Sequence, residues 1–259
     1  LWGAAPALGL WASRPPGIAR RGVLQADEIR ALRLTARRTW RYFETFVTPA
    51  DQMLPPDNFQ EDPRPVVAQR TSPTNIGLYL LAAATARDFG WAGTVDTVER
   101  LEASFATLRK MPRFKGHFFN WYGTADLRAF DPPYVSSVDS GNLAGHLIAL
   151  ANACEEWRDG APSTDARAGM EDAVQLARQC ADGLAAAHGG LGQRVIDLLD
   201  DMAAQLQGPQ GTDAIAPAPA PVEALAEEPQ EAVRNPLVEG AAAGDLHRLA
   251  RAGLRLAQA

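Results

Sequence analysis

The sequence predicts an all-α fold in which helices that are apolar on every side alternate with amphipathic helices. Residues 76–89 and 140–157 are almost wholly apolar over a helical length, whereas residues 26–47 and 94–108 place apolar side chains at three- and four-residue steps. A helix that is apolar all round is expected to be buried all round, and an amphipathic helix to cover it. This alternation is typical of an α/α barrel or toroid, and a plain helical bundle also accounts for it.

The composition is that of a protein with a sizeable core. Of the 259 residues, 46% are hydrophobic. The formal net charge is −6 and no basic face is evident, so nucleic acid is not an expected partner. Cys154 and Cys180 lie in apolar helical patterns without CxxC spacing, and we expect buried, reduced thiols.

Both ends of the chain differ from its middle. Residues 1–11 are apolar but too short to span a bilayer, and Arg14, Arg20 and Arg21 follow them. This is the pattern of a cytoplasmic exit from a membrane segment, and equally that of an apolar surface turn. Alternating Ala and Pro in residues 208–232 predict a disordered linker. The expected organisation is a membrane-proximal linker (1–24), a partial α/α domain (25–207), the Ala/Pro linker (208–232) and a short C-terminal helix (233–259).

Local signals define the elements of the central domain. Ser72 followed by Pro73 predicts a helix N-terminus, with the hydroxyl as cap and proline in the first turn. Gly90 is suited to end that helix. Residues 118–122 and 127–130 flank a turn and predict one small β-hairpin. Residues 165–187 and 193–207 are amphipathic and predict two further helices.

Polar side chains gather in the two loops that lead into the two apolar helices. We select as candidate substrate-binding residues Asp57, Asn58, Glu61, Asp62, Arg70, Asn75, Asn120, Trp121, Tyr122, Tyr134, Asp139 and Asn142. Carboxylates and amides bind hydroxyl groups, and aromatic rings stack on the C–H face of a sugar. Loops that enter neighbouring inner helices meet at one end of a toroid, so these residues predict a carbohydrate-binding cleft.

A purely structural role accounts for part of this pattern. Asp139 or Ser140 is suited to cap the helix that follows, and Glu61 and Asp62 can pair with Arg64 or Arg70.

Other kinds of functional site have little support in the sequence. The sequence has no nucleotide-binding glycine loop, and its four histidines have no metal-ligand spacing, so neither a cofactor nor a metal is predicted.

Two long blocks, residues 37–91 (beginning RRTWRYFETF) and 114–154 (beginning FKGHFFNWYG), closely resemble the cyclic β-1,2-glucan synthase family. The resemblance covers about residues 37–157 and places the chain in the front portion of the central cyclisation domain. It implies an (α/α)6 barrel and a reaction in which linear β-1,2-glucan is transglycosylated into a ring. It also implies β-1,2-glucan and the remaining domains of the parent synthase as partners, with membrane contact through the N-terminal segment. The implied location is the cytoplasmic face of the bacterial inner membrane, within a multi-pass protein, with the present piece itself soluble.

The sequence departs from the family in two respects. The resemblance implies two catalytic glutamates in stretches like SEARL and SESAYN, and neither stretch occurs here. Gly123 stands where the family usually has an acid. No catalytic residue is therefore assigned, and the chain is expected to be incomplete as a catalyst. The alternatives are a carbohydrate-binding or assembly module without catalysis of its own, or an inactive gene fragment.

Overall fold

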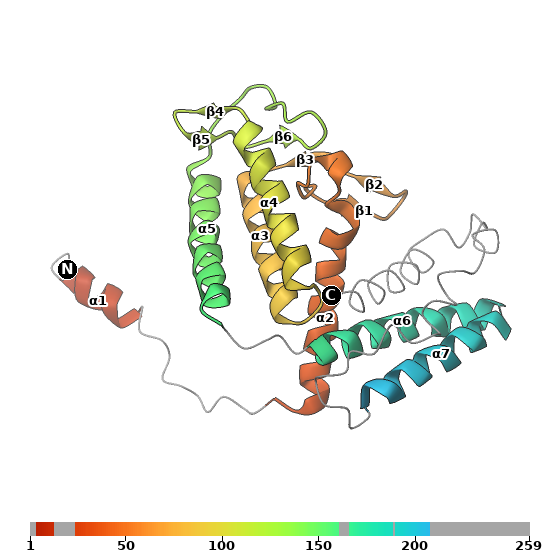
Figure 1. Ribbon diagram of the computed structural model, residues 1–259. Helices are drawn as coiled ribbons and strands as arrows, with labels where there is room; N and C mark the ends of the chain where they lie inside the picture. The colour runs from red at the N-terminus through yellow and green to blue at the C-terminus, as the bar shows by residue number, and fades with distance from the viewer. Residues whose placement is uncertain (1–3, 13–23, 161–165, 189, 208–259) are drawn as a thin grey trace. The chain divides into compact units, whose positions relative to one another are not determined.

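The computed structural model describes residues 4–12, 24–160, 166–188 and 190–207 (Figure 1). The chain divides into two units, residues 1–33 and 34–259. The expected linker 208–232 and C-terminal helix 233–259 lie outside the described residues, as does much of the expected N-terminal linker.

The described chain is mainly helical, which confirms the predicted all-α class. The helices are α1 (Ala5–Ala12), α2 (Ala26–Phe46), α3 (Pro73–Asp88), α4 (Thr94–Lys110), α5 (Ser137–Arg158), α6 (Ala166–His188) and α7 (Gly190–Gln207). The strands are β1 (Phe59–Gln60), β2 (Val66–Val67), β3 (Arg70–Thr71), β4 (Arg113–Phe114), β5 (His117–Phe118) and β6 (Tyr122–Gly123). No helix in the described ranges is long and apolar enough to cross a membrane.

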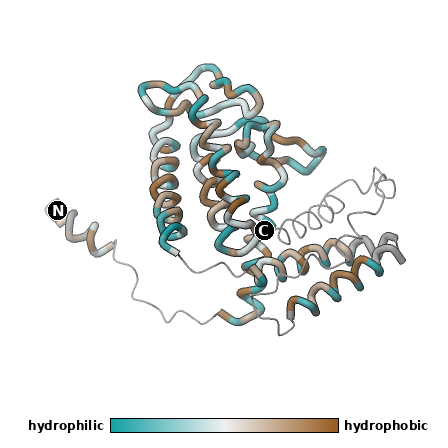
Figure 2. Tube along the Cα trace, viewed as in Figure 1, coloured by the Kyte–Doolittle hydropathy of each residue, from teal (hydrophilic) through white to brown (hydrophobic). Residues whose placement is uncertain are grey.

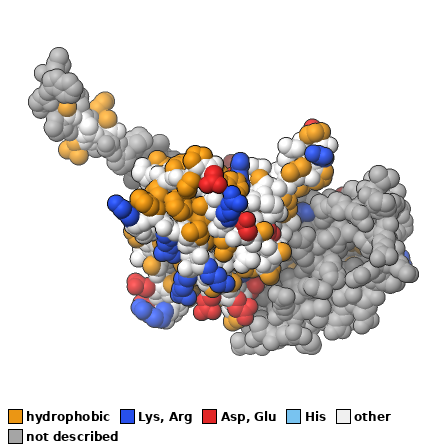
Figure 3. All heavy atoms as spheres, turned by 90° about the horizontal axis from the view of Figure 1, so that it is seen from above, with side chains coloured by type: hydrophobic (Ala, Val, Ile, Leu, Met, Phe, Trp, Pro, Cys, Tyr) orange, Lys and Arg blue, Asp and Glu red, His pale blue; other side chains and the backbone are white. Residues whose placement is uncertain are grey.

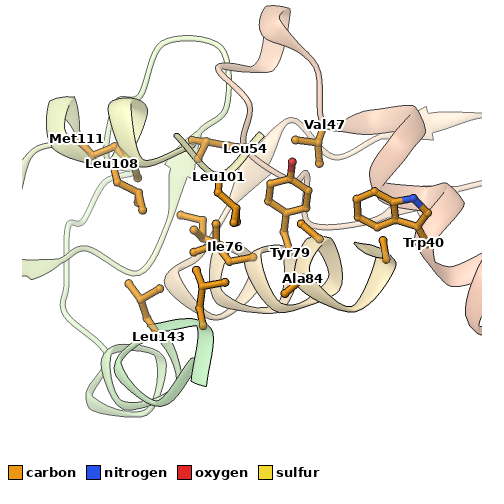
Figure 4. Close-up of a cluster of buried hydrophobic side chains, with 14 of the residues drawn as sticks. Trp40, Val47, Leu54, Ile76, Tyr79, Ala84, Leu101, Leu108, Met111 and Leu143 are labelled. Carbon is orange, nitrogen blue, oxygen red and sulfur yellow. The ribbon is translucent and has the colours of Figure 1, made fainter. Parts of the chain in front are cut away.

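Helix α3 is the central helix of the larger unit. Its N-terminus forms as predicted, since Ser72 Oγ accepts a hydrogen bond from the backbone N–H of Asn75 at 3.2 Å and Pro73 occupies the first turn. Gly90 follows the helix with φ 76°, which favours glycine. Helices α4 and α5 both pack against α3 (Figure 1). Ile76 and Tyr79 are fully buried in this core (Figure 4), and so is Leu80.

Helix α5 differs from the prediction that it is buried on all sides. Apolar residues occur along both α3 and α5 (Figure 2), but in α5 only Leu143 and Leu150 are buried. Val138 and Ile148 remain 69% and 66% exposed. One face of α5 packs on α3, and the opposite apolar face is exposed among the described residues. The inner-helix prediction is therefore right for most of α3, where Leu78 is still 49% exposed, and wrong for α5.

The buried face of α2 also differs in part from the predicted one. Leu34 and Trp40 are buried, whereas Ile29 and Leu32, expected on the inner face, are about half exposed. Of the two cysteines, Cys154 is exposed and Cys180 is half-buried, so the expected burial of both thiols is wrong.

Three two-stranded antiparallel ladders take the place of the single predicted hairpin. Strand β1 pairs with β2, and β4 pairs with β5. The third ladder joins β3 to β6, with Arg70 opposite Gly123 and Thr71 opposite Tyr122. The predicted pairing of residues 118–122 with 127–130 is reduced to one bridge between Tyr122 and Ala129. Because β3 precedes α3 and β6 lies in the loop before α5, this ladder holds the two polar loops together.

Helices α6 and α7 pack against each other around Val174, Ala177, Ala181 and Leu199. Asp172 of α6 accepts a hydrogen bond from Trp91 Nε1 at 2.8 Å. This contact connects the helical pair to the turn after α3.

The contact between α3 and α5 depends on Gly77. A Cβ at this position would collide with the ring of His146. We expect Gly77→Ala to lower the free energy of unfolding by about 1–3 kcal/mol, the usual cost of overpacking a core. Urea unfolding followed by far-UV circular dichroism measures this change.

Gly145→Ala is the matched control, because a Cβ there meets nothing within 4 Å and alanine is the better helix former. It should leave stability unchanged or raise it by up to about 1 kcal/mol. Equal effects of the two substitutions would contradict the close α3–α5 contact.

Candidate functional site

A hydrogen-bonded group of polar side chains lies where α3 and α5 begin. Its members come from the two loops and from the first turns of the two helices. We name as the polar junction Asp57, Arg70, Thr74, Asn75, Asn120, Trp121, Tyr134, Asp139 and Asn142.

Asp139 connects the N-termini of α3 and α5. Its Oδ1 accepts a hydrogen bond of 2.7 Å from the hydroxyl of Thr74, in the first turn of α3. The expectation that Asp139 or Ser140 caps α5 is wrong, because Ser136 is the N-cap and its Oγ accepts from the Asp139 N–H at 3.2 Å. The carboxylate of Asp139 is therefore available for contacts outside its own helix. Its place in the first turn is also favourable for a negative charge, since the helix dipole is positive there.

Asn120 extends this contact to the aromatic side chains. It is 7% exposed, and its amide is oriented so that the nitrogen donates to Asp139 Oδ2 at 2.8 Å. The amide oxygen then accepts from Trp121 Nε1 at 2.8 Å and from the Tyr134 hydroxyl at 2.7 Å. The reverse orientation would point the oxygen at a carboxylate, which is unfavourable. One buried amide thus fixes both rings relative to Asp139.

Asp57 organises the first loop in a similar way. Its Oδ1 accepts from Asn75 Nδ2 at 3.2 Å, and its Oδ2 accepts from Asn58 Nδ2 at 3.0 Å. Arg70 donates to the same Oδ2 through Nε at 3.0 Å and Nη2 at 2.8 Å. The predicted pairing of Arg70 with an acid of this loop is therefore made by Asp57.

Arg70 also joins the two loops. Its guanidinium carbon lies 4.8 Å from the centre of the Trp121 ring, a cation–π distance. Because β3 pairs with β6, Arg70 is held close to the loop that carries Trp121. The loops of residues 57–75 and 120–142 therefore form one surface.

Asp57 also affects a neighbouring tyrosine. The hydroxyl of Tyr42 donates to the carbonyl of Pro56 at 2.9 Å. Burial, and secondly the negative charge of Asp57, raise the pKa of Tyr42 to about 12. Tyr42 thus stays protonated at neutral pH and holds the loop backbone just before Asp57.

Four of the selected residues are not members of the polar junction: Asn58, which contacts it only through Asp57, and Glu61, Asp62 and Tyr122, which lie apart from it. Glu61 and Asp62 are exposed in the connection between β1 and β2, and no hydrogen bond or ion pair joins them to the junction in the part of the chain described. Tyr122 is fully buried; its hydroxyl donates to the Pro112 carbonyl and accepts from the Phe119 N–H, both at 2.7 Å. Its phenol therefore supports the loop from within the core.

Sequence reasoning missed Thr74. It donates to Asp139 and also accepts from Asn142 Nδ2 at 3.1 Å. Thr74 could have been selected from the sequence by its position, because it lies between Ser72-Pro73 and Asn75 in the first turn of a helix that was predicted to begin at the polar cleft.

The local structure explains why position 123 is a glycine. It is buried, and a Cβ at this position would collide with the carboxylate of Asp126. Asp126 in turn accepts a hydrogen bond from the Arg128 N–H at 3.0 Å, closing a turn. Any side chain at position 123 would have to displace Asp126.

The arrangement is suited to binding and less to acid–base catalysis. Both carboxylates of the polar junction already accept hydrogen bonds on each oxygen. The groups left partly open are the ring of Tyr134 and the side chains of Asn142 and Arg70. Among the residues that the structure describes, no group of three or more His, Cys, Asp or Glu side chains is placed to hold a metal ion.

Comparison with known proteins gives one relative at high identity. The chain is 52% identical over 171 residues to the cyclic β-(1,2)-glucan synthase NdvB of Rhizobium meliloti. The chain is related in sequence to a segment of a cyclic β-(1,2)-glucan synthase. The match covers 66% of this chain but only 6% of the synthase. The resemblance expected from residues 37–157 is thereby confirmed.

Two other comparisons add little to this relationship. No protein-family model matches the chain. Solved structures of candidate glucoamylases from Bacteroides fragilis and Bacteroides caccae align with TM-scores of 0.40 and 0.39 at 16% and 14% identity. They cover 73% and 68% of this chain, and the alignments span 37% and 36% of those proteins.

The buried amide of Asn120 gives a direct test of the polar junction. We expect Asn120→Ala to lower the free energy of unfolding by about 2–3 kcal/mol, because it leaves a partly buried carboxylate oxygen, an indole N–H and a hydroxyl without their partner. Equilibrium urea unfolding measures the loss. Asn152→Ala, at an exposed position of α5, is the control and should change stability by less than about 0.5 kcal/mol. A loss no greater than that of the control would show that the network does not form.

Proposed function

We propose that this chain is part of a glucan-cyclising domain and that its polar junction binds β-1,2-glucan. The relationship to a cyclic β-(1,2)-glucan synthase is the observation that carries the proposal. The polar junction supports it, because carboxylate, amide, guanidinium and aromatic groups together are what hydroxyl-rich rings require. Tyr134, with its ring about half exposed and its hydroxyl held by Asn120, is the proposed stacking surface.

In this proposal the two acids order the binding surface and do not carry the chemistry. Asp139 fixes Asn120 and the N-terminus of α3, while Asp57 fixes Arg70 and Asn75. Retaining transglycosylation requires a nucleophilic carboxylate and a carboxylic acid about 5 Å apart across the scissile bond. The proposed nucleophile and acid belong to other parts of the parent synthase. The proposed partners are accordingly β-1,2-glucan and those remaining domains.

The proposed location is the cytoplasmic side of the bacterial inner membrane. The apolar character of residues 1–11, followed by Arg14, Arg20 and Arg21, supports membrane contact at this end. Glu61, Asp62 and Asn58, exposed around the first hairpin, are proposed as outer contacts for a longer glucan chain.

Binding is tested by titrating linear β-1,2-gluco-oligosaccharides while following tryptophan fluorescence and heat of binding. We expect saturable binding, with the environment of Trp121 changing, and about fivefold weaker binding after Tyr134→Ala, since aromatic contacts contribute on the order of 1 kcal/mol. Phe114→Ala is a matched control, because Phe114 is exposed to nearly the same extent (54% against 53%) but lies in β4. Absence of binding, or an equal effect of both substitutions, would contradict the proposal.

A second experiment separates binding from catalysis. Incubation with linear β-1,2-glucan should give no cyclic product, because the segments expected to carry the catalytic glutamates do not occur in this chain. Binding without turnover is the result that the proposal predicts for this chain by itself. Formation of cyclic glucan would show that the catalytic groups have been misplaced.

A further inference from the structure

A cationic segment runs from the end of α4 through the β4–β5 hairpin. Arg109, Lys110, Arg113 and Lys115 fall within seven residues, and no acid occurs between Glu102 and Asp126. All four cationic residues are exposed. The whole chain carries a net charge of −6, so this concentration of positive charge is local and opposite in sign to the rest.

The hairpin places an aromatic ring beside these charges. Lys115 and Gly116 have φ angles of 50° and 88°, which close the tight turn between β4 and β5. Arg113 lies opposite Phe118, and the guanidinium carbon is 4.3 Å from the centre of that ring, which packs on the core. Phe114 lies opposite His117 and alternates to the other face of the ladder. Its ring is 54% exposed, with the Lys115 ammonium 5.5 Å from its centre.

These cations lack the acidic partners that a stabilising surface network would have. Within the described ranges, no carboxylate forms an ion pair with any of the four. Arg109 and Lys110 also lie at the C-terminus of α4, where the helix dipole favours positive charge. Arg113 also acts at this helix end, since its Nη2 donates a hydrogen bond to the Leu108 carbonyl at 2.9 Å. Neither effect accounts for Lys115 or for the exposed aromatic ring at the tip.

We propose that the segment 109–117, the cationic hairpin, docks on the surface of an anionic lipid bilayer. Clustered lysines and arginines are attracted by lipid phosphates, and an exposed aromatic ring at the tip enters the headgroup region. Figure 3 looks onto the end of the molecule that carries β4 and β5, where basic (blue), acidic (red) and apolar (orange) side chains are all exposed. A nucleic acid would be attracted by the same charges, but a single half-exposed ring beside a tight turn favours the lipid interface. None of the four cations, nor Phe114, belongs to the polar junction.

Co-sedimentation with vesicles tests the proposal on the full chain. We compare vesicles of phosphatidylcholine alone with vesicles that also contain phosphatidylglycerol, at low and at high salt. The chain should bind the anionic vesicles more tightly, and salt should weaken that preference. Replacing both Lys110 and Lys115 with glutamine should weaken anionic-vesicle binding by about 25-fold, since each cation near such a surface contributes about fivefold. Phe114→Ser should weaken it by about tenfold.

Matched variants separate this surface from the rest of the chain. Arg158→Gln with Arg167→Gln removes two exposed cations elsewhere, and Phe130→Ser removes an exposed ring outside the hairpin. Both should retain vesicle binding. Leu10 and Trp11 are exposed in α1, but binding through that apolar segment would not depend on the hairpin residues. Hairpin variants that bind as well as these controls would overturn the proposal. So would a hairpin-dependent affinity for a single-stranded oligonucleotide without vesicle binding.

Discussion

The carboxylate of Asp139 is the contact on which the candidate site depends. It lies in the first turn of α5 and accepts hydrogen bonds from Thr74 at the start of α3 and from Asn120 in the intervening loop. Ser136 makes this possible by capping α5. Without that cap, the Asp139 side chain would be the natural partner for the free N–H groups of its own helix. A serine three residues earlier thus converts a potential helix cap into a bridge between two helices.

The bridge is effective because the helices it joins are fixed elsewhere. Helix α3 is anchored in the core by Ile76, Tyr79 and Leu80, and α5 approaches it closely at Gly77. Two hydroxyls of α4 also hold the first loop, since Ser104 donates to the Met53 carbonyl at 2.9 Å and Thr107 to the Gln52 carbonyl at 2.7 Å. The hydrogen bonds of the polar junction can therefore select one arrangement of the two loops, because the packing of α3, α4 and α5 already restricts the conformations available to them.

The sequence was most informative where a signal was local. The Ser72-Pro73 start of α3, its apolar length and its glycine stop were predictable because caps and periodicity act within a few residues. The exposed face of α5 was not predictable, because a run of apolar residues shows which side chains could be buried but not which other element covers them. The β3–β6 ladder and the role of Asn120 depend on contacts between distant residues. Glu61 and Asp62 are close to Asp57 in sequence, but the β1–β2 hairpin carries them away from the junction.

A double-mutant cycle between Thr74 and Asp139 tests the central contact most directly. The free energy of unfolding is measured for Thr74→Ala, Asp139→Ala and the double variant, so that effects of each residue on its own helix cancel. The structure predicts a coupling energy of at least about 1 kcal/mol, as expected for a hydrogen bond to a charged group. Additive losses, with a coupling below about 0.3 kcal/mol, would mean that the two loops are not joined through Asp139.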